Sequence, residues 1–161
     1  MKTYEDIGAL MTKVEDIARF ILGGNATFTV VSKKTETRYT FKVRQKIEKD
    51  NAGVVTKVSP YFVGLLSGPD NVGSYTYLGA IFDEGEHGKF KLTKASKMND
   101  DSIPVRTFRW VFNKAMQGDS ALTDGVEFWH EGSCCVCGRK LTVPESIASG
   151  IGPVCLAKGR S

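Results

Sequence analysis

The chain has 161 residues, of which 41% are hydrophobic and 25% charged, with a formal net charge of +4. This balance is typical of a globular protein and predicts one core of about 120 residues plus a small appendix. No apolar run approaches the roughly 20 residues that span a bilayer. The first six residues contain no apolar signal-peptide core, so we expect no membrane partner and a location in a reducing cytoplasm.

The chain opens with apolar residues at helical spacing, which predict an amphipathic helix over residues 4–22, ended by Gly23. Strand-like segments follow at residues 27–32, 37–44, 54–58, 61–66, 74–82 and 89–93. A second helix is predicted after Ser102, with Pro104 in its first turn and a buried stripe that includes Phe108 and Phe112. This order predicts an α+β fold, an antiparallel sheet flanked by two helices.

Two parts are expected along the chain. Residues 1–118 should form the α+β domain, and residues 125–161 a small C-terminal zinc-binding subdomain, joined by the acidic linker 117–124. Because the core pattern ends before residue 119, a chain truncated near that point is expected to keep a folded domain.

Basic residues are concentrated in two segments. Residues 33–58 contain eight Lys or Arg against three acids, and residues 89–118 contain seven against two, whereas residues 59–88 contain four acids and no Lys or Arg. The two segments would form one electropositive face if the fold brings them together, as in a nucleic-acid footprint. Alternatively, these side chains only solvate the outer faces of strands and a helix.

Residues 37–44 alternate between apolar and basic residues. The basic face carries a row that steps by about 7 Å, close to the spacing of single-strand phosphates: Arg38, Lys42 and Arg44. Tyrosines on the sheet could stack bases beside this row: Tyr39, Tyr61, Tyr75 and Tyr77. We therefore expect a nucleic-acid site, with single-stranded DNA favoured, formed by Arg38, Lys42, Arg44, Tyr75 and Tyr77.

All four cysteines lie in the last part of the chain. The Cys134-x-x-Cys137-Gly pattern is typical of a zinc knuckle, in which a tight turn directs both thiolates to one point. Cys155 follows at a spacing suited to the second half of such a site. Three thiolates and an imidazole would close a tetrahedral shell, so the expected cofactor is a structural Zn²⁺ held by His130, Cys134, Cys137 and Cys155.

Other assignments of these residues stay open. Cys135 is expected to be a bystander, although a shell that uses Cys135 and a further ligand in place of His130 is the alternative. A disulfide framework does not suit a reducing compartment, and a redox Cys-x-x-Cys would need a strand-to-helix setting. A short helix between the two halves of the site is predicted from the capping box Thr142 to Glu145 and the stop at Gly150.

Several stretches carry a resemblance: residues 31–41, 61–71, 75–82, and above all 130–147 with the Gly-Ile-Gly-Pro-Val-Cys run 150–155. Together they resemble a family of small phage-encoded proteins of unassigned function, over about residues 25–157. The resemblance implies a phage or prophage origin, action in the host cytoplasm and zinc binding by the tail, but no activity. Cys135 departs from the family pattern, which has a small or polar residue there.

Enzyme activity is not expected. The sequence contains no Ser/His/acid set, no phosphate-cradling Gly-rich loop, and no Glu beside a zinc-ligating His at helical spacing. The acidic cluster 83–87 is more typical of a solvated turn than of a metal site. Two functions remain: an accessory protein that binds nucleic acid through the basic hairpin face, or a protein-binding module that inhibits or redirects a host factor, including one of host defence.

Overall fold

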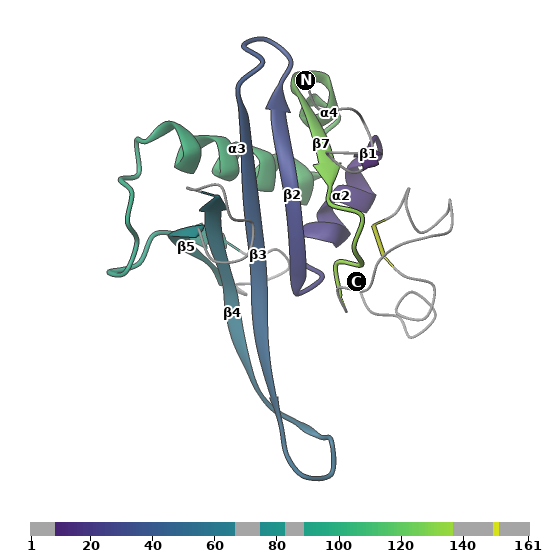
Figure 1. The fold of residues 1–161 in the computed structure, drawn as a ribbon, viewed down its shortest axis with the longest axis vertical. Helices are drawn as coiled ribbons and strands as arrows, with labels where there is room; N and C mark the ends of the chain where they lie inside the picture. The colour runs from purple at the N-terminus through teal and green to yellow at the C-terminus, as the bar shows by residue number, and fades with distance from the viewer. Residues whose placement is uncertain (1–8, 67–74, 83–88, 137–149, 152–161) are drawn as a thin grey trace.

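The computed structural model describes residues 9–66, 75–82, 89–136 and 150–151, which form an antiparallel sheet with its main helices on one face (Figure 1). The elements, in chain order, are β1 (Ala9–Met11), α2 (Val14–Ile21), β2 (Asn25–Ser32), β3 (Arg38–Lys49), β4 (Val55–Leu66), β5 (Tyr75–Phe82), β6 (Lys89–Lys91), α3 (Ile103–Gln117), α4 (Ala121–Gly125) and β7 (Val126–His130). Within these residues, no helix is both long and apolar enough to cross a membrane.

The seven described strands follow the order β1-β7-β2-β3-β4-β5-β6, and every pairing is antiparallel. Strands β2 to β6 form a meander, in which each strand lies beside the next one in the chain. Strand β7 instead returns from the far end of the sequence and lies between β1 and β2. The α+β class and the antiparallel sheet are therefore confirmed.

Aromatic rings fill the space between the sheet and the helices α2 and α3. Phe28 of β2 stacks on Phe128 of β7 at 4.5 Å between ring centroids, and Phe20 of α2 packs edge-on against both rings. Phe108 of α3 contacts Phe41 at 5.3 Å on the other side of Phe28. Each of these side chains is at most 1% exposed, so burial of aromatic surface is the main stabilising term of the fold.

Helix α3 forms as its sequence predicts. Ser102 precedes the first turn, and Pro104 sits within that turn, where its missing N–H is not needed. Gly118, at φ 65°, ends the helix in the left-handed conformation that glycine adopts without strain. The buried stripe agrees with the prediction, and it faces the sheet: Val105, Phe108, Val111, Phe112 and Ala115.

The predicted N-terminal helix is too long. Only Val14–Ile21 is helical, and Ala9–Met11 form strand β1 against β7. Leu10 and Met11 alternate as strand residues do, since Leu10 is 40% exposed and Met11 is 2% exposed. Residues 4–8 lie outside the described part of the chain. The apolar residues that suggested one long helix thus belong to a strand and a helix, and helical periodicity alone did not distinguish the two elements.

Strand β4 is continuous where two strands were predicted. Its pairing with β3 shifts register at Ser59 and Pro60, where the Ser59 hydroxyl accepts a hydrogen bond from the Lys46 N–H at 2.8 Å. A bulge of this kind tolerates a proline inside a strand, because the missing N–H falls where pairing is already interrupted. Beyond the bulge the two strands continue as a hairpin, residues 46–58, that projects from the body; we call it the arm (Figure 1).

The predicted boundary between the domain and the tail falls at the wrong place. The structure places Val126–His130, the start of the predicted tail, inside the sheet between β1 and β2. Ala121–Gly125, in the predicted linker, form the short helix α4 that leads into β7. The sheet therefore needs residues up to at least 130, and any separate zinc-binding part can begin only after β7.

The second basic segment is divided between the two faces of the sheet. Helix α3 covers the sheet on the side of the aromatic core, and Arg106, Arg109 and Lys114 belong to that helix. Arg109 forms an ion pair with Asp100, and Lys114 pairs with Asp119 at 3.1 Å. The basic residues of β3 instead lie on strand positions of the opposite face. Lys89 and Lys91 of β6 flank the buried Phe90 and take strand positions on that same opposite face, so the second segment joins it only in part.

Candidate nucleic-acid interface

The face of the sheet opposite α2 and α3 carries the candidate site. Residues that pair across four strands form one row, Thr27 of β2, Lys42 of β3, Gly64 of β4 and Tyr77 of β5. Their neighbours along the strands, such as Phe28, Phe41 and Val63, are buried on the other side. Alternation of side chains along each strand thus separates a polar and aromatic open face from the core.

A shallow hollow of about 210 Å³ lies around Gly64. Its lining, the aromatic hollow, consists of Lys42, Arg44, Phe62, Val63, Gly64, Tyr75 and Tyr77. Phe62 is 44% exposed, and its ring centroid lies 6.2 Å from that of Tyr77 at 57°. Gly64 has no side chain, and Tyr75 packs close over it: a Cβ added to Gly64 would lie 3.3 Å from the Tyr75 Cβ.

Cations border these rings directly. The Lys42 ammonium lies 4.9 Å from the centroid of the Tyr75 ring, within the range of a cation–π interaction. Partial burial lowers the pKa of Lys42, Arg44 lowers it further, and Glu131 opposes both. Burial also raises the pKa of the Tyr75 phenol, with a further increase from Glu131. The raised pKa keeps the Tyr75 phenol neutral near pH 7.

A second hollow, of about 230 Å³, adjoins the first and shares Arg44 with it. Its lining, the polar hollow, consists of Asn25, Thr27, Arg44, Glu131 and Ser133. Asn25 and Thr27 alternate along β2 with the buried residues Ala26 and Phe28, and Glu131 and Ser133 come from the turn after β7. A carboxylate and a guanidinium thus face one space.

Four of the five predicted nucleic-acid residues are brought together. Lys42, Arg44, Tyr75 and Tyr77 line the aromatic hollow. Arg38 lines neither hollow; it stands four residues from Lys42 on β3, about 13 Å at strand spacing.

The interval between Arg38 and Lys42 is taken by Thr40, whose hydroxyl is hydrogen-bonded to that of Thr29 at 2.8 Å. The predicted row of three cations is therefore a pair and a separate arginine.

Two further tyrosines considered from the sequence do not belong to the open face. Tyr39 packs against the core cluster, and the Tyr61 hydroxyl donates a hydrogen bond to the Leu22 carbonyl at 3.0 Å on the helix side of the sheet. Phe62 and Glu131 were missed instead. Alternation from Tyr61 could have placed Phe62 on the open face, but no local signal placed Glu131 beside β2, because that position depends on the return of β7.

The first half of the predicted zinc knuckle is described up to Val136. The Val136 N–H donates to the Cys134 sulfur at 3.4 Å, which is the amide-to-sulfur arrangement that stabilises a thiolate in a knuckle turn. Cys137 and Cys155 lie outside the described residues. Within the described residues, no group of three or more His, Cys, Asp or Glu side chains is placed to hold a metal ion.

Cys135 is packed into the fold next to the turn after α2. Its N–H donates to the Gly150 carbonyl at 2.9 Å, and its carbonyl accepts from the Asn25 N–H at 2.7 Å. A Cβ built on Gly23 would lie 2.6 Å from the Cys135 sulfur, so the thiol occupies the space that this glycine leaves. These contacts give Cys135 a packing role in the fold.

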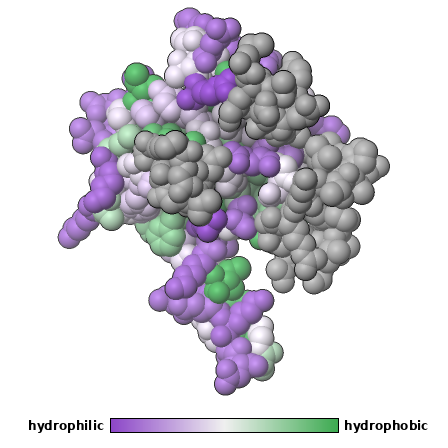
Figure 2. Space-filling view, in the orientation of Figure 1, coloured by the Kyte–Doolittle hydropathy of each residue, from purple (hydrophilic) through white to green (hydrophobic). Residues whose placement is uncertain are grey.

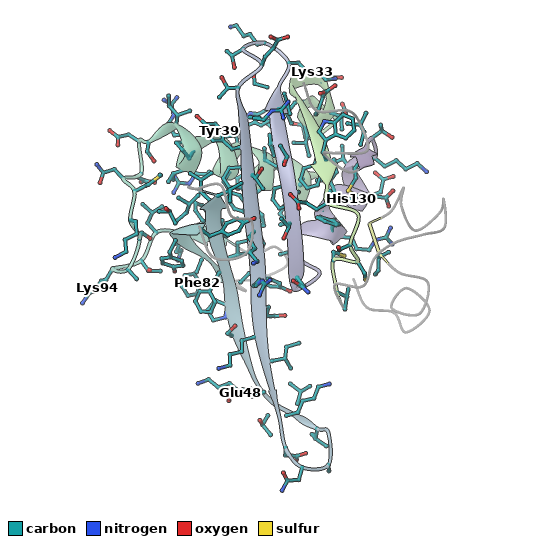
Figure 3. The ribbon with its side chains drawn as sticks, viewed as in Figure 1. Lys33, Tyr39, Glu48, Phe82, Lys94 and His130 are labelled. Carbon is teal, nitrogen blue, oxygen red and sulfur yellow. The ribbon has the colours of Figure 1, made fainter. Side chains whose placement is uncertain are left out.

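His130 faces the core at the end of β7 (Figure 3), fully buried and stacked on Phe20 at 5.6 Å. Its Nδ1 accepts a hydrogen bond from the Gly132 N–H at 2.8 Å, which leaves Nδ1 without a proton. A histidine that ligates a metal through Nε2 normally carries a proton on Nδ1 and donates it to a second group. Metal ligation by His130 therefore requires the Gly132 hydrogen bond to open.

Gly150 provides a test of how tightly the chain at residues 150–151 packs against Phe20 of α2. It has φ 75°, and an added Cβ would lie 2.4 Å from the Phe20 ring. Gly150→Ala is therefore expected to lower the free energy of unfolding by about 2–4 kcal/mol, from backbone strain and overpacking together. Gly132→Ala is the matched control, because Gly132 has φ 81° but an added Cβ would meet nothing within 4 Å.

Chemical denaturation of both variants separates the two contributions. The Gly132 variant is expected to lose only the strain part, about 1–2 kcal/mol. Equal losses in the two variants would show that residue 150 does not pack on Phe20 in solution.

Comparison with known proteins gives one match. Residues 127–159 match a family of unknown function (DUF6011). The matched part includes most of β7, the polar-hollow residues Glu131 and Ser133, and all four cysteines. No curated protein and no solved structure matches the chain significantly. The match supports an unassigned-function family for the C-terminal part, in keeping with the resemblance seen in the sequence.

Proposed function

We propose that the open face of the sheet binds single-stranded nucleic acid, with single-stranded DNA favoured. The observation that carries this proposal is the aromatic hollow, where Phe62, Tyr75 and Tyr77 lie beside Lys42 and Arg44. Stacking platforms bordered by cations are how proteins bind single strands without sequence preference. In this proposal a base lies in the aromatic hollow against the rings, and Lys42 neutralises a neighbouring phosphate.

A structural Zn²⁺ is the second part of the proposal. Cys134, Cys137, Cys155 and His130 would hold it, with His130 joining when its bond to Gly132 opens. Support comes from the Val136 N–H that points at the Cys134 sulfur, and from Ile151, which is 1% exposed in the core and stands four residues before Cys155. Four residues of chain reach about 14 Å at most, so both halves of the site start from the same region of the fold.

A protein-binding module that inhibits or redirects a host factor, including one of host defence, remains the second candidate. The arm favours it, because three apolar residues are largely exposed there: Ile47, Val54 and Val55. Figure 2 shows the arm as mainly hydrophilic with a hydrophobic patch. Either function suits a protein of phage or prophage origin that acts in the host cytoplasm, which is what the sequence resemblance implies.

Substitutions on the open face test the main proposal. Phe62→Ala is expected to weaken binding of a short oligothymidylate by about 1–3 kcal/mol, the usual range for one stacked base, with little change in the salt dependence. Lys42→Ala is expected to reduce the slope of log affinity against log salt by about 0.7. Fluorescence anisotropy at several salt concentrations measures both quantities.

Arg38→Ala serves as the matched control, since Arg38 is exposed on the same strand but lines neither hollow. Its effect is expected to be smaller than that of Lys42→Ala. The proposal fails if the wild type shows no measurable affinity for DNA or RNA at low salt, and retention of one host protein after nuclease treatment would then favour the second candidate.

A further inference from the structure

We infer that the polar hollow is a base-reading site that selects guanine next to the stacked nucleotide. This inference rests on the proposed function and deepens it, because it assigns sequence preference to a surface otherwise expected to have none. Its residues come from three separate parts of the chain: Asn25 and Thr27 of β2, Arg44 of β3, and Glu131 and Ser133 of the turn after β7.

The carboxylate decides which part of a nucleotide can enter. Glu131 lies near enough to Lys42 and Tyr75 to alter the pKa of both, so its charge acts across this face. A phosphate would be repelled from a space that a carboxylate borders. A base edge with N–H donors would instead gain charge-assisted hydrogen bonds from that carboxylate.

Guanine matches the two charged groups best. Its Watson–Crick edge presents the N1–H and the exocyclic amino group side by side, a pair of donors that one carboxylate can accept together. Its O6 and N7 are acceptors for which arginine is the commonest partner. Glu131 and Arg44 can therefore serve one guanine, whereas adenine and cytosine each offer a single amino donor, and thymine a lone ring N–H.

The walls of the hollow are held by backbone hydrogen bonds, which reduces the cost of ordering them on binding. The Asn25 N–H donates to the Cys135 carbonyl at 2.7 Å, and the Gln45 N–H next to Arg44 donates to the Gly24 carbonyl at 3.0 Å.

The polar hollow also lies where it can receive the nucleotide next to the stacked one. Two strand spacings, about 10 Å, separate β2 from β4, so the aromatic and polar hollows would take different nucleotides. Arg44 lines both hollows, which makes the path between them continuous.

The test compares oligothymidylates that carry one central substitution, which is guanine, adenine, cytosine or hypoxanthine; hypoxanthine lacks only the exocyclic amino group of guanine. The wild type is expected to bind the guanine oligonucleotide about tenfold more tightly than the hypoxanthine oligonucleotide, as for one good base-edge contact. Glu131→Gln is expected to reduce that ratio to about twofold or less, while removal of a negative charge raises the affinity for both oligonucleotides. Glu48→Gln, an exposed acid on the arm, is the charge-matched control and should leave the ratio unchanged.

Each outcome has one meaning. A ratio near one in the wild type, or a ratio that Glu131→Gln does not change, overturns the inference and leaves binding through the aromatic hollow intact. A higher affinity for cytosine or adenine than for guanine also overturns it. An absence of binding to every oligonucleotide refutes the proposed function itself, which separates that failure from the failure of guanine selection.

Discussion

A chain that ends after Asp119 is expected not to fold. This reverses the expectation from the sequence, because the truncation removes β7 from between β1 and β2. Strand β7 contributes Phe128, Trp129 and His130, none of them more than 3% exposed. Loss of one buried Phe or Trp side chain alone costs about 3–5 kcal/mol. Loss of all three, with two rows of strand pairing, is as large as the roughly 5–15 kcal/mol that stabilises a typical domain.

A two-dimensional amide spectrum of residues 1–119 is the direct measurement. It should show the narrow dispersion of an unfolded chain or the broad signals of an aggregate. Full-length Phe128→Ala is the control, since it removes the central ring of β7 but keeps the backbone pairing. That variant should stay folded and lose about 3–5 kcal/mol. A well-dispersed spectrum from residues 1–119 would show that β7 docks onto a domain already complete.

The elements that the sequence predicted well are those with long, regular patterns. Helix α3 has a buried stripe over four turns, a proline in its first turn and a glycine at its end, so local chemistry and periodicity agree. The alternation of residues 38–44 likewise assigned Phe41 and Val43 to the core. Each of these features depends on residues near one another in the chain.

The elements that were missed depend on residues far apart. Val126, Phe128 and His130 alternate with Glu127 and Trp129, which is a strand pattern, but five residues are too few to stand out beside a cysteine motif. Strand β1 is shorter still and exists because β7 offers it a partner. Propensity does not reveal such strands, since their stability comes from pairing and packing.

The candidate site also combines residues that could be predicted from local sequence with residues that could not. Lys42 and Arg44 could be assigned to one face from β3 alone, and both do line the aromatic hollow. The polar hollow could not be predicted, because Asn25 and Glu131 stand more than one hundred positions apart and meet only through the pairing of β7 with β2. A surface built by a return of the chain becomes visible only in the folded protein.

Cys134→Ser is expected to release the proposed Zn²⁺, whereas Cys135→Ser is expected to retain it. The two variants differ by one position and make the same chemical change, so each is the control for the other. Cys134 holds the sulfur to which the Val136 N–H donates, while Cys135 packs against Gly23. Cys135→Ser places a hydroxyl in that fully buried position and should cost about 1–3 kcal/mol of stability without loss of metal.

Elemental analysis of freshly purified, reduced protein measures the metal, with about one Zn²⁺ per chain expected in the wild type. His130→Gln extends the comparison, since the amide oxygen can still accept from Gly132 but no imidazole remains to complete the shell. Unchanged zinc in that variant would assign the fourth position to another group. Equal loss from the Cys134 and Cys135 variants would show that the adjacent cysteine is a ligand, and absence of metal from the wild type would exclude the site.

Loss of zinc should also change the structure of the polar hollow on the open face of the sheet. Glu131 and Ser133 belong to the same turn as Cys134, and Cys135 is hydrogen-bonded to Asn25 on the far wall of the polar hollow. Because metal binding is coupled to the folding of the segment that carries its ligands, Cys134→Ser should loosen this wall while the rings around Gly64 stay in place. The variant should therefore keep its affinity for oligothymidylate and lose its preference for guanine, a combination that general unfolding would not produce.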